Sequence, residues 1–308
     1  MGVDLFFILS GFLITGILIS RKEAPLGAYF GHFYQRRARR ILPPYLTLMI
    51  LVTLIFGINS WIHEWYYYLF LMNVIRAFSL NEPKVLVILW SLAVEEQFYL
   101  VWPFVVRFFT EKRILIFAAS LLVITPILRW IFTPFFQLHW AIFALTPFRM
   151  DCLAAGAILA VVARRRPQWL PRFGLYGLIL SALGLCGLLW LGAHGYTTDG
   201  NTKVGNTFIY FFTLWTCFGV MTWALSGKFV GVLRWRPVVY IGRISYTIYL
   251  THLLALWICS RFIPNHYLAV AAGAVLVISF ASLSWFLMEK PLLEGRRKKA
   301  PATVALTS

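Results

Sequence analysis

Charged side chains recur inside apolar stretches of this sequence, where they would be expensive to hold. They are the acids Asp4, Glu95, Glu96, Asp151 and Glu289 and the bases Arg129, Arg149, Arg243 and His252. A charge near the centre of a bilayer costs about 2.5 to 3.5 kcal/mol on insertion scales, so each needs a partner or a water-filled cavity. Some could form ion pairs that hold helices together, but the whole set favours a polar cavity.

The stretch WSLAVEEQFYLVWP, residues 90–103, carries two neighbouring carboxylates. At about 100° per residue, one helical face holds Ser91, Glu95, Phe98 or Tyr99, and Trp102, whereas Glu96 is turned away from it. At least one of the two acids therefore needs a partner on another helix. Such an acid could bind a cation, orient a base or neutralise an arginine.

The stretch FYQRRARRILPPYL, residues 33–46, places Arg36, Arg37 and Arg40 within an arc of about 100° if it is helical. Arginine recognises phosphate through two parallel hydrogen bonds and stays charged in any setting. The alternative is an ordinary cytoplasmic anchor of the positive-inside kind. Pro43 and Pro44 favour a helix that starts just after the cluster.

Two further groups of side chains could take part in chemistry. In ISYTIYLTH, residues 244–252, Ser245, Tyr249 and His252 lie on one face of a helix. A lone histidine in a membrane span is more often a hydrogen-bonded structural residue than a catalyst. The cysteines lie in apolar stretches without ligand spacing, which indicates buried packing and no metal site. They are Cys152, Cys186, Cys217 and Cys259.

Composition identifies the elements that must position these residues. The 308 residues are 60% apolar and only 13% charged, and the mean hydropathy is +0.77. A soluble domain would need about 25% charged residues. The net charge of +17 comes from short basic clusters between apolar runs, which topology explains better than nucleic acid binding. The chain is therefore predicted to be an all-α, polytopic transmembrane helical bundle.

Ten stretches are long and apolar enough to span, so we expect nine to ten spans. They are 3–20, 41–58, 63–80, 86–108, 113–131, 147–163, 173–192, 207–225, 238–260 and 267–289. If 63–80 instead dips in or lies at the outer interface, the basic loops 21–40, 107–113, 164–172, 228–236 and 290–299 all face the cytoplasm. These loops hold 21 of the 28 Lys and Arg residues. The start of the chain, 59–85 and 193–206 are then outside.

Six ordered motifs resemble those of the membrane-bound acyltransferase family 3, the bacterial O-acetyltransferase type. They are GVDLFFILSGFLIT (2–15), RRARRILPPYL (36–46), WSLAVEEQFYLVWP (90–103), FRMDCLAAG (148–156), ISYTIYLTH (244–252) and MEKP (288–291). The resemblance implies a multi-pass enzyme of the bacterial inner (cytoplasmic) membrane. Its expected reaction moves an acyl group, usually acetyl, from cytoplasmic acyl-CoA to a hydroxyl of a surface or exported glycan or glycolipid.

The resemblance also implies roles for individual residues. Arg37 and Arg40 would contact CoA, and Arg36 is a further substrate-binding candidate beside them. Acyl-CoA is a donor substrate, so no resident cofactor is expected. Glu95 would be the functional acid, and Asp151 and His252 would shape the cavity. The remaining substrate-binding candidates are Trp90, Ser91, Glu96, Tyr99, Arg149 and Tyr249.

Family members carry a helix before the GVD motif, and a histidine on it is the proposed general base. We therefore expect the DNA upstream of Met1 to encode about 20 apolar residues with a histidine toward their outer end. Without it, His252 is the candidate substitute base, and a general base typically contributes 10²- to 10⁴-fold to rate.

The remaining expectations concern domains and partners. Residues 1–291 should form the membrane domain, and 292–308 a basic cytoplasmic tail. Handover to the acceptor would use the membrane domain itself or a separate extracytoplasmic transferase. A proton-coupled transporter or flippase would use the same buried charges, and an inactive partner of an export complex is a third interpretation. Dependence on CoA distinguishes the enzyme from the transporter.

Overall fold

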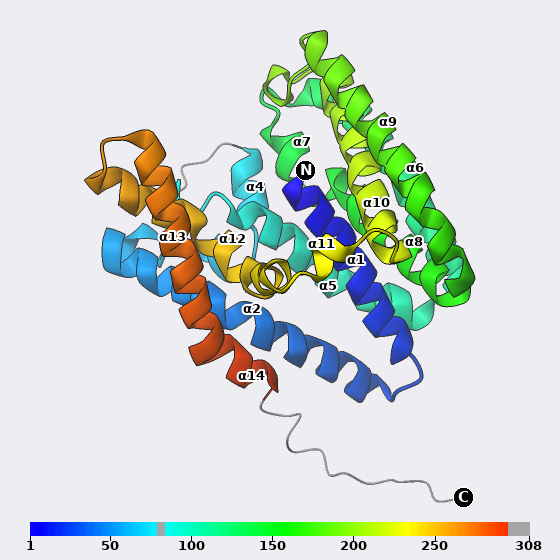
Figure 1. The fold of residues 1–308 in the computed structure, drawn as a ribbon, viewed down its shortest axis with the longest axis horizontal. Helices are drawn as coiled ribbons and strands as arrows, with labels where there is room; N and C mark the ends of the chain where they lie inside the picture. Colours follow the sequence, from blue (N-terminus) through cyan, green and yellow to red (C-terminus); the bar gives the residue numbers. More distant parts are fainter. Residues whose placement is uncertain (79–83, 295–308) are drawn as a thin grey trace, which may run out of the picture. The chain divides into compact units, whose positions relative to one another are not determined.

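The computed structural model describes residues 1–78 and 84–294, and these residues form helices joined by turns, with no strand among them (Figure 1). The prediction of an all-α, polytopic helical membrane protein is confirmed. Most of the predicted tail 292–308, the end of the basic loop 290–299 and part of the predicted outer segment 59–85 lie outside the described residues.

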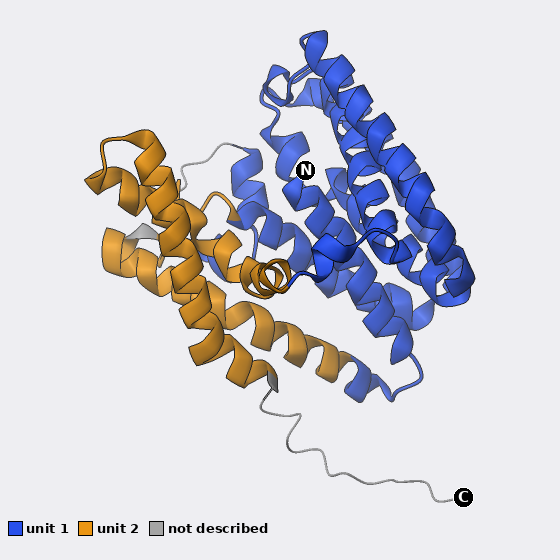
Figure 2. Ribbon diagram, in the orientation of Figure 1, with its two compact units in different colours: residues 1–29, 64–82, 89–235 blue, residues 30–63, 83–88, 236–308 orange. Residues whose placement is uncertain are grey.

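The chain divides into two compact units, each of which draws on separate parts of the sequence (Figure 2). Unit 1 comprises Met1–Tyr29, Glu64–Glu82 and Leu89–Trp235, and unit 2 comprises Phe30–His63, Pro83–Ile88 and Arg236–Ser308. The helix α2, Leu26–Phe56, begins in unit 1 and continues through unit 2.

Unit 1 contains most of the long helices. Its α-helices are α1 (Gly2–Ser20), α3 (Trp65–Tyr68), α4 (Met72–Ala77), α5 (Leu89–Phe108), α6 (Glu111–Phe132), α7 (Trp140–Ala144), α8 (Met150–Arg165), α9 (Phe173–Ala193), α10 (Tyr210–Ser226) and α11 (Gly231–Arg234). Short 3-10 or π turns join them: η2 (Thr133–Phe135), η3 (Thr146–Phe148), η4 (Pro167–Arg172), η5 (Thr198–Gly200) and η6 (Gly205–Ile209).

Unit 2 is built around two long helices that follow one another in sequence. Besides most of α2, it contains η1 (Ile58–Ser60), α12 (Arg236–Phe262), α13 (His266–Ser284), η7 (Trp285–Glu289) and α14 (Lys290–Glu294). A β-carbon on Gly273 of α13 would lie 3.4 Å from the α-carbon of Leu256, so α12 and α13 pack closely.

Within residues 1–78 and 84–294, six helical segments are long and apolar enough to cross a membrane. They are Gly2–Ser20, Leu26–Phe56, Glu111–Phe135, Pro167–Ala193, Gly205–Ser226 and His266–Leu293. Helices also occupy three other predicted spans, as α5, α8 and α12. With 16 residues, α8 is shorter than a typical span, and α5 carries Glu95, Glu96 and Arg107.

Two expectations about element boundaries differ from the structure. Residues 65–77 form two short helices, α3 and α4, separated by Phe70 at a φ of 52°, so no single helix covers the predicted stretch 63–80. In addition, α2 runs through the arginine cluster and through Pro43 and Pro44, so the predicted helix start after the cluster is wrong.

The reason for the long α2 lies in the side chains that it buries. Tyr29, Phe33 and Ile41 before the prolines and Tyr45 and Leu48 after them are all buried. At about 100° per residue they form one continuous face, and burial of that face outweighs the loss of a backbone donor at each proline. Tertiary packing therefore overrides the local proline signal.

Glycines set the closest helix crossings in unit 1. A β-carbon on Gly11 of α1 would lie 2.0 Å from the carbonyl oxygen of Leu153 on α8, and one on Gly156 would lie 2.0 Å from that of Ile8. The crossing of α9 and α10 is similarly tight at Gly177 and Gly219. Small residues let membrane helices approach closely, and here they position α8 against α1 and α10 against α9.

Candidate functional site

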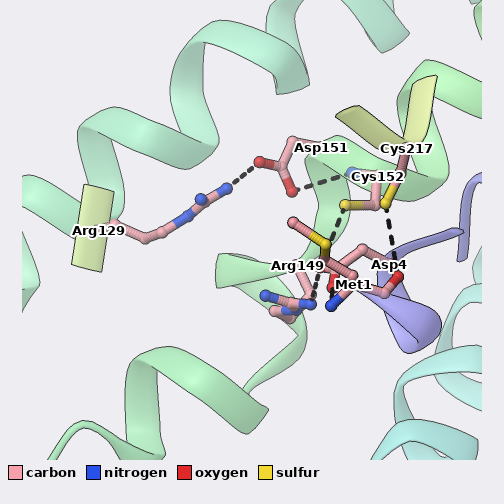
Figure 3. Close-up of polar contacts among 7 residues, drawn as sticks. All are labelled: Met1, Asp4, Arg129, Arg149, Asp151, Cys152 and Cys217. Carbon is pink, nitrogen blue, oxygen red and sulfur yellow. Dashed lines mark hydrogen bonds and ion pairs between the residues drawn. The ribbon is translucent and has the colours of Figure 1, made fainter. Parts of the chain in front are cut away.

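Two buried ion pairs lie where α1, α6 and α8 meet in unit 1 (Figure 3). Arg149, at the N-terminal end of α8, donates to Asp4 in the first turn of α1. Arg129 of α6 donates to Asp151, whose second oxygen accepts the backbone N–H of Cys152 at 2.9 Å. All four charged residues are at most 5% exposed. The four charges therefore neutralise one another in pairs.

The ring of Tyr210, at the start of α10, lies beside both arginines. The guanidinium carbons of Arg129 and Arg149 are 5.1 and 4.6 Å from its centre, within the range of a cation–π interaction. Within the described residues, Nε and Nη1 of Arg129, Nε of Arg149 and the Tyr210 hydroxyl have no hydrogen-bond partner although they are buried. Donors of this kind suit water or another oxygen-bearing molecule.

The predicted acid Glu95 is buried in α5 and is linked to α1. The Tyr99 hydroxyl donates to Glu95 Oε1 at 2.8 Å, and the same hydroxyl lies 2.5 Å from Ser10 Oγ on α1. One turn further along, Trp102 Nε1 donates to Thr15 Oγ1 at 2.8 Å. Tyr99 and Trp102, on the predicted face of α5, therefore contact α1.

The other candidates from this motif lie nearby on α5. Trp90 is buried, with its ring 6.2 Å from that of Phe7 and 4.5 Å from that of Phe143. Ser91 is buried as well, whereas Glu96 is half-buried, as expected for a residue turned away from the face. The aromatic side chains of α1, α5 and α7 thus surround the buried end of Arg149, whose guanidinium carbon lies 5.9 Å from the Trp90 ring.

A second polar network joins α4, α5 and η3. Asn73 donates to Gln97 Oε1 at 3.3 Å and to Thr146 Oγ1 at 3.0 Å, and Gln97 donates back to Asn73 Oδ1 at 3.0 Å. Gln97 also donates to the carbonyl of Phe70 at 3.1 Å. This network fixes the turn between α3 and α4 and the segment just before Arg149.

His139 lies between the predicted spans, in the connection that leads to α7. Its Nε2 is 3.6 Å from a carboxylate oxygen of Asp199. Burial lowers the pKa of His139 below its ordinary value of 6.5, although Asp199 opposes this shift. Arg76 stacks on the neighbouring Trp140 ring at 3.5 Å and also lowers the pKa of His139.

The predicted phosphate-binding arginines lie in unit 2, in the middle of α2. Arg36 and Arg40 are exposed and Arg37 is half-buried. On a helix with about 100° per residue, Arg37 lies toward the buried face and the other two lie at its edge. The three guanidinium groups therefore share one side of an uninterrupted helix.

The predicted side chains of α12 fall on a partly exposed face of unit 2. Tyr249 donates to the carbonyl of Ile88 at 3.1 Å, and His252 Nδ1 lies 2.7 Å from the carbonyl of Tyr249. A neutral His252 that donates from Nδ1 keeps its lone pair on Nε2. Buried polar contacts of α12 are made by Thr247, which donates to Glu289 Oε1 at 2.7 Å, and by Tyr246, which donates to the carbonyl of Ile41 at 3.4 Å.

Sequence patterns alone did not single out several of these side chains. Tyr210 stands in an apolar run with no polar neighbour to mark it, and Gln97 follows two acids that draw more notice. Thr247 and Ser284, which donate to Glu289 at 2.7 and 3.1 Å, are ordinary hydroxyl residues within apolar runs. Three-dimensional proximity is the only signal that connects these residues to their partners.

The arrangement of unit 1 provides buried acids, hydroxyls and cations. These groups can take part in proton transfer, hydrogen bonding and charge stabilisation. Within residues 1–78 and 84–294, no cluster of three His, Cys, Asp or Glu side chains could hold a metal ion.

Comparison with known proteins gives matches over nearly the whole chain. Residues 1–289 match the family model described as "Acyltransferase domain" (Acyl_transf_3). The chain is 29% identical over 286 residues to the O-acetyltransferase OatA of Staphylococcus aureus, a match that covers 82% of this chain and 45% of that protein. It is 28% identical over 331 residues to the putative peptidoglycan O-acetyltransferase YrhL of Bacillus subtilis, covering 95% of this chain and 50% of that protein.

A third relative matches a shorter region. The peptidoglycan O-acetyltransferase OatA of Listeria monocytogenes is 35% identical over 120 residues, which cover 33% of this chain and 19% of that protein. The chain thus spans about half the length of the first two relatives. No solved structure matches it. Because the family model covers residues 1–289, the chain belongs to the acyltransferase 3 family of multi-pass membrane proteins.

Proposed function

We propose that this protein moves an acetyl group from cytoplasmic acyl-CoA to a hydroxyl group of a surface or exported glycan. The observation that carries the proposal is the family match over residues 1–289, together with relatives that are named O-acetyltransferases. Two of these relatives are named for peptidoglycan, which makes a peptidoglycan sugar the first acceptor to test.

The proposed donor site is the arginine face of α2. The CoA moiety carries phosphates, and charge-assisted hydrogen bonds from arginine forks are about twice as strong as neutral ones. Arg36, Arg37 and Arg40 offer three such forks on one side of a helix. In the nine-span topology this part of α2 faces the cytoplasm, where acyl-CoA is made.

The proposed reacting groups use the buried polar side chains. Glu95, held by Tyr99, is the proposed functional acid, and its neighbours Trp90, Ser91 and Glu96 are proposed to contact substrate. In unit 2, His252 is the candidate for a base through Nε2, with Tyr249 beside it: the two ring centres are 5.7 Å apart. Arg149 and Asp151 are proposed to shape the polar interior of unit 1 through their ion pairs.

The test is an acetyl-transfer assay in bacterial membranes that contain the full chain. Labelled acetyl-CoA is added on the cytoplasmic side, and label is measured in peptidoglycan and in other surface glycans. We expect transfer by the wild type and loss of transfer in Glu95→Gln, which keeps the acceptor of the Tyr99 hydrogen bond but removes the charge.

A matched control and a contrary outcome complete the test. Glu111→Gln removes a carboxylate that pairs with Arg164 and Arg165 near the surface, so it should leave transfer unchanged. Proton-coupled movement of a solute with no dependence on CoA would contradict the proposal and favour a transporter.

A further inference from the structure

An apolar groove of about 190 Å³ opens on the outside of unit 1 between α8, α9 and α10. Its walls are formed by Ile158, Val162, Phe173, Tyr176, Leu180 and Phe218. The buried residues Gly177 and Thr222 also line it, and the Thr222 hydroxyl donates to the carbonyl of Gly219 at 2.9 Å. The Thr222 hydroxyl is therefore already satisfied, and the lining other than the Tyr176 hydroxyl on the rim offers hydrocarbon contact to an occupant.

The groove faces the lipid side of a membrane helix. It is bordered by α9, which lies in the candidate span Pro167–Ala193, and only 22% of the most apolar window of that span is buried in the protein. Tyr176, on the rim of the groove, is 68% exposed. An apolar groove on such a helix is filled by acyl chains, because no water is available in the hydrocarbon layer.

Basic side chains gather at one end of this groove. Arg172 directly precedes the lining residue Phe173, and Arg166 follows Val162 by about one helical turn. The β-carbon of Lys228 is 3.9 Å from where a β-carbon on Gly174 would lie, which places Lys228 beside the first turn of α9. All three side chains belong to unit 1 and are exposed.

At the same end of unit 1, two other arginines are paired with an acid. Arg164 and Arg165 both lie within 4 Å of Glu111 at the start of α6. Arg166, Arg172 and Lys228 have no acidic partner within the described part of the chain. Three cations without an acidic partner in the described part of the chain therefore lie beside an open hydrocarbon groove, whereas Arg164 and Arg165 are paired with Glu111.

We propose that this groove binds an anionic glycerophospholipid, with one acyl chain between α8, α9 and α10 and the phosphate against Arg172 and Lys228. Basic clusters alone are explained by the positive-inside rule, and an apolar groove alone accepts any lipid. Their combination selects a lipid that has both a hydrocarbon chain and a negative charge. In the proposed topology this end faces the cytoplasmic leaflet, whose negative surface attracts basic segments. The site is separate from acyl transfer and does not depend on it.

The test measures lipid binding to the purified full chain in detergent, by native mass spectrometry and by thermal unfolding. Phosphatidylglycerol and phosphatidylcholine with identical acyl chains are compared, and glycerol 3-phosphate is added as a headgroup without chains. We expect phosphatidylglycerol to bind more tightly and to raise the unfolding temperature, and glycerol 3-phosphate not to compete.

Variants separate the two halves of the site. Arg172→Gln with Lys228→Gln should weaken phosphatidylglycerol binding about tenfold and leave phosphatidylcholine unchanged, since each basic side chain near an anionic headgroup contributes about one tenfold step or less. Leu180→Trp should fill the groove and weaken both lipids. If Leu180→Trp does not fold, Ile158→Phe tests the same space.

The matched control removes two charges at the same end of unit 1 but away from the groove. Lys112 and Arg113 directly follow Glu111 on α6, are exposed and do not line the groove. Lys112→Gln with Arg113→Gln should leave binding unchanged. An equal loss in this control, equal binding of the two lipids by the wild type, or full competition by glycerol 3-phosphate would overturn the proposal.

Discussion

At the scale of single residues, the buried charges of unit 1 are held in pairs, and this makes each partner necessary for folding. The Asp151 carboxylate accepts hydrogen bonds from the Arg129 side chain and from the backbone N–H of Cys152. Both Arg129 and Asp151 are buried. Removing one member of a buried pair typically costs about 3 to 5 kcal/mol, because the other charge is left without compensation.

We therefore predict that Asp151→Asn strongly lowers the thermal stability of the detergent-purified protein. The double variant Arg129→Gln with Asp151→Asn should be more stable than Asp151→Asn, because no unpaired charge remains. Asp199→Asn serves as the control, since that side chain is 85% exposed. Equal unfolding temperatures for Asp151→Asn and the wild type would show that the pair does not support the fold.

The arginine face of α2 leads to a second prediction, which tests geometry rather than charge. Arg37→Lys keeps the positive charge but replaces a planar fork by a point charge, so binding of acyl-CoA should weaken by roughly tenfold. Arg39→Lys, outside the arc of Arg36, Arg37 and Arg40, should have little effect. Titration calorimetry with CoA would measure the affinity of each variant. An affinity of Arg37→Lys equal to that of the wild type would show that the cluster serves only to anchor the topology.

The environment of His139 gives a dependence on pH. Because the pKa of His139 is lowered in the folded protein, the unfolded chain binds more protons below 6.5. Above pH 6.5 the neutral His139 side chain makes its full contribution to the free energy of unfolding. That contribution is lost as the pH falls from 6.5 toward the pKa of His139 in the folded protein.

We expect amide exchange in residues 136–144 to accelerate between about pH 7 and about pH 5.5, after correction for intrinsic rates. His139→Gln cannot titrate, so the same segment should lose this dependence. A pH response that persists in His139→Gln would assign it to another group.

At the scale of elements, helix crossings in unit 1 depend on glycines at the contact points. Gly11 and Gly16 lie on the same helix, yet a β-carbon on Gly11 would overlap the carbonyl of Leu153 whereas one on Gly16 would meet nothing within 4 Å. The two positions therefore form a matched pair for testing the packing of α1 against α8.

Gly11→Ala should destabilise the protein by about 1 to 3 kcal/mol, the usual cost of overpacking. Gly16→Ala should be neutral or stabilising by up to about 1 kcal/mol, because alanine favours the helix. Thermal unfolding of the two variants in the same detergent measures the difference. Similar unfolding temperatures would mean that α1 and α8 separate easily at this crossing.

The element scale also shows where sequence reasoning succeeds and where it fails. Long apolar runs such as Gly2–Ser20 and Gly205–Ser226 could be predicted, because membrane helices need length and hydropathy more than any particular partner. The start of α2 could not, because the local signal of Pro43 and Pro44 opposes burial of a face that only the folded unit defines. Local propensity is the weaker of the two effects.

In the candidate site, too, the sequence predicts some features and not others. The sequence predicts that Asp4, Arg129, Arg149 and Asp151 need partners, since each lies in an apolar run. It does not predict which acid meets which base, because that depends on how α1, α6 and α8 cross. Tyr210 could not be found at all, since an aromatic residue in a span is ordinary until two guanidinium groups are seen beside it.

At the scale of the whole molecule, the candidate residues are distributed over two compact units. Glu95 and the paired charges belong to unit 1, whereas the arginine face and His252 belong to unit 2. Loss of donor binding in Arg37→Lys and loss of transfer in Glu95→Gln are therefore separable, because the substitutions fall in different units.

The last prediction concerns how the whole chain crosses the membrane. The nine-span topology places the basic residues after α8 in the cytoplasm, since Lys and Arg near the ends of spans stay on that side. One structural feature supports this topology: residues 65–77 form two short helices and no single spanning helix. The pairs of Arg164 and Arg165 with Glu111 place the start of α6 and the end of α8 at the same end of unit 1, as both the nine-span and the ten-span topology require. A reporter fused after Arg166 should read cytoplasmic, and one fused after Asn201 should read extracytoplasmic. If the fusion after Arg166 reads extracytoplasmic, α8 ends on the outer side, the ten-span alternative holds, and the basic end of the lipid groove faces the outer leaflet.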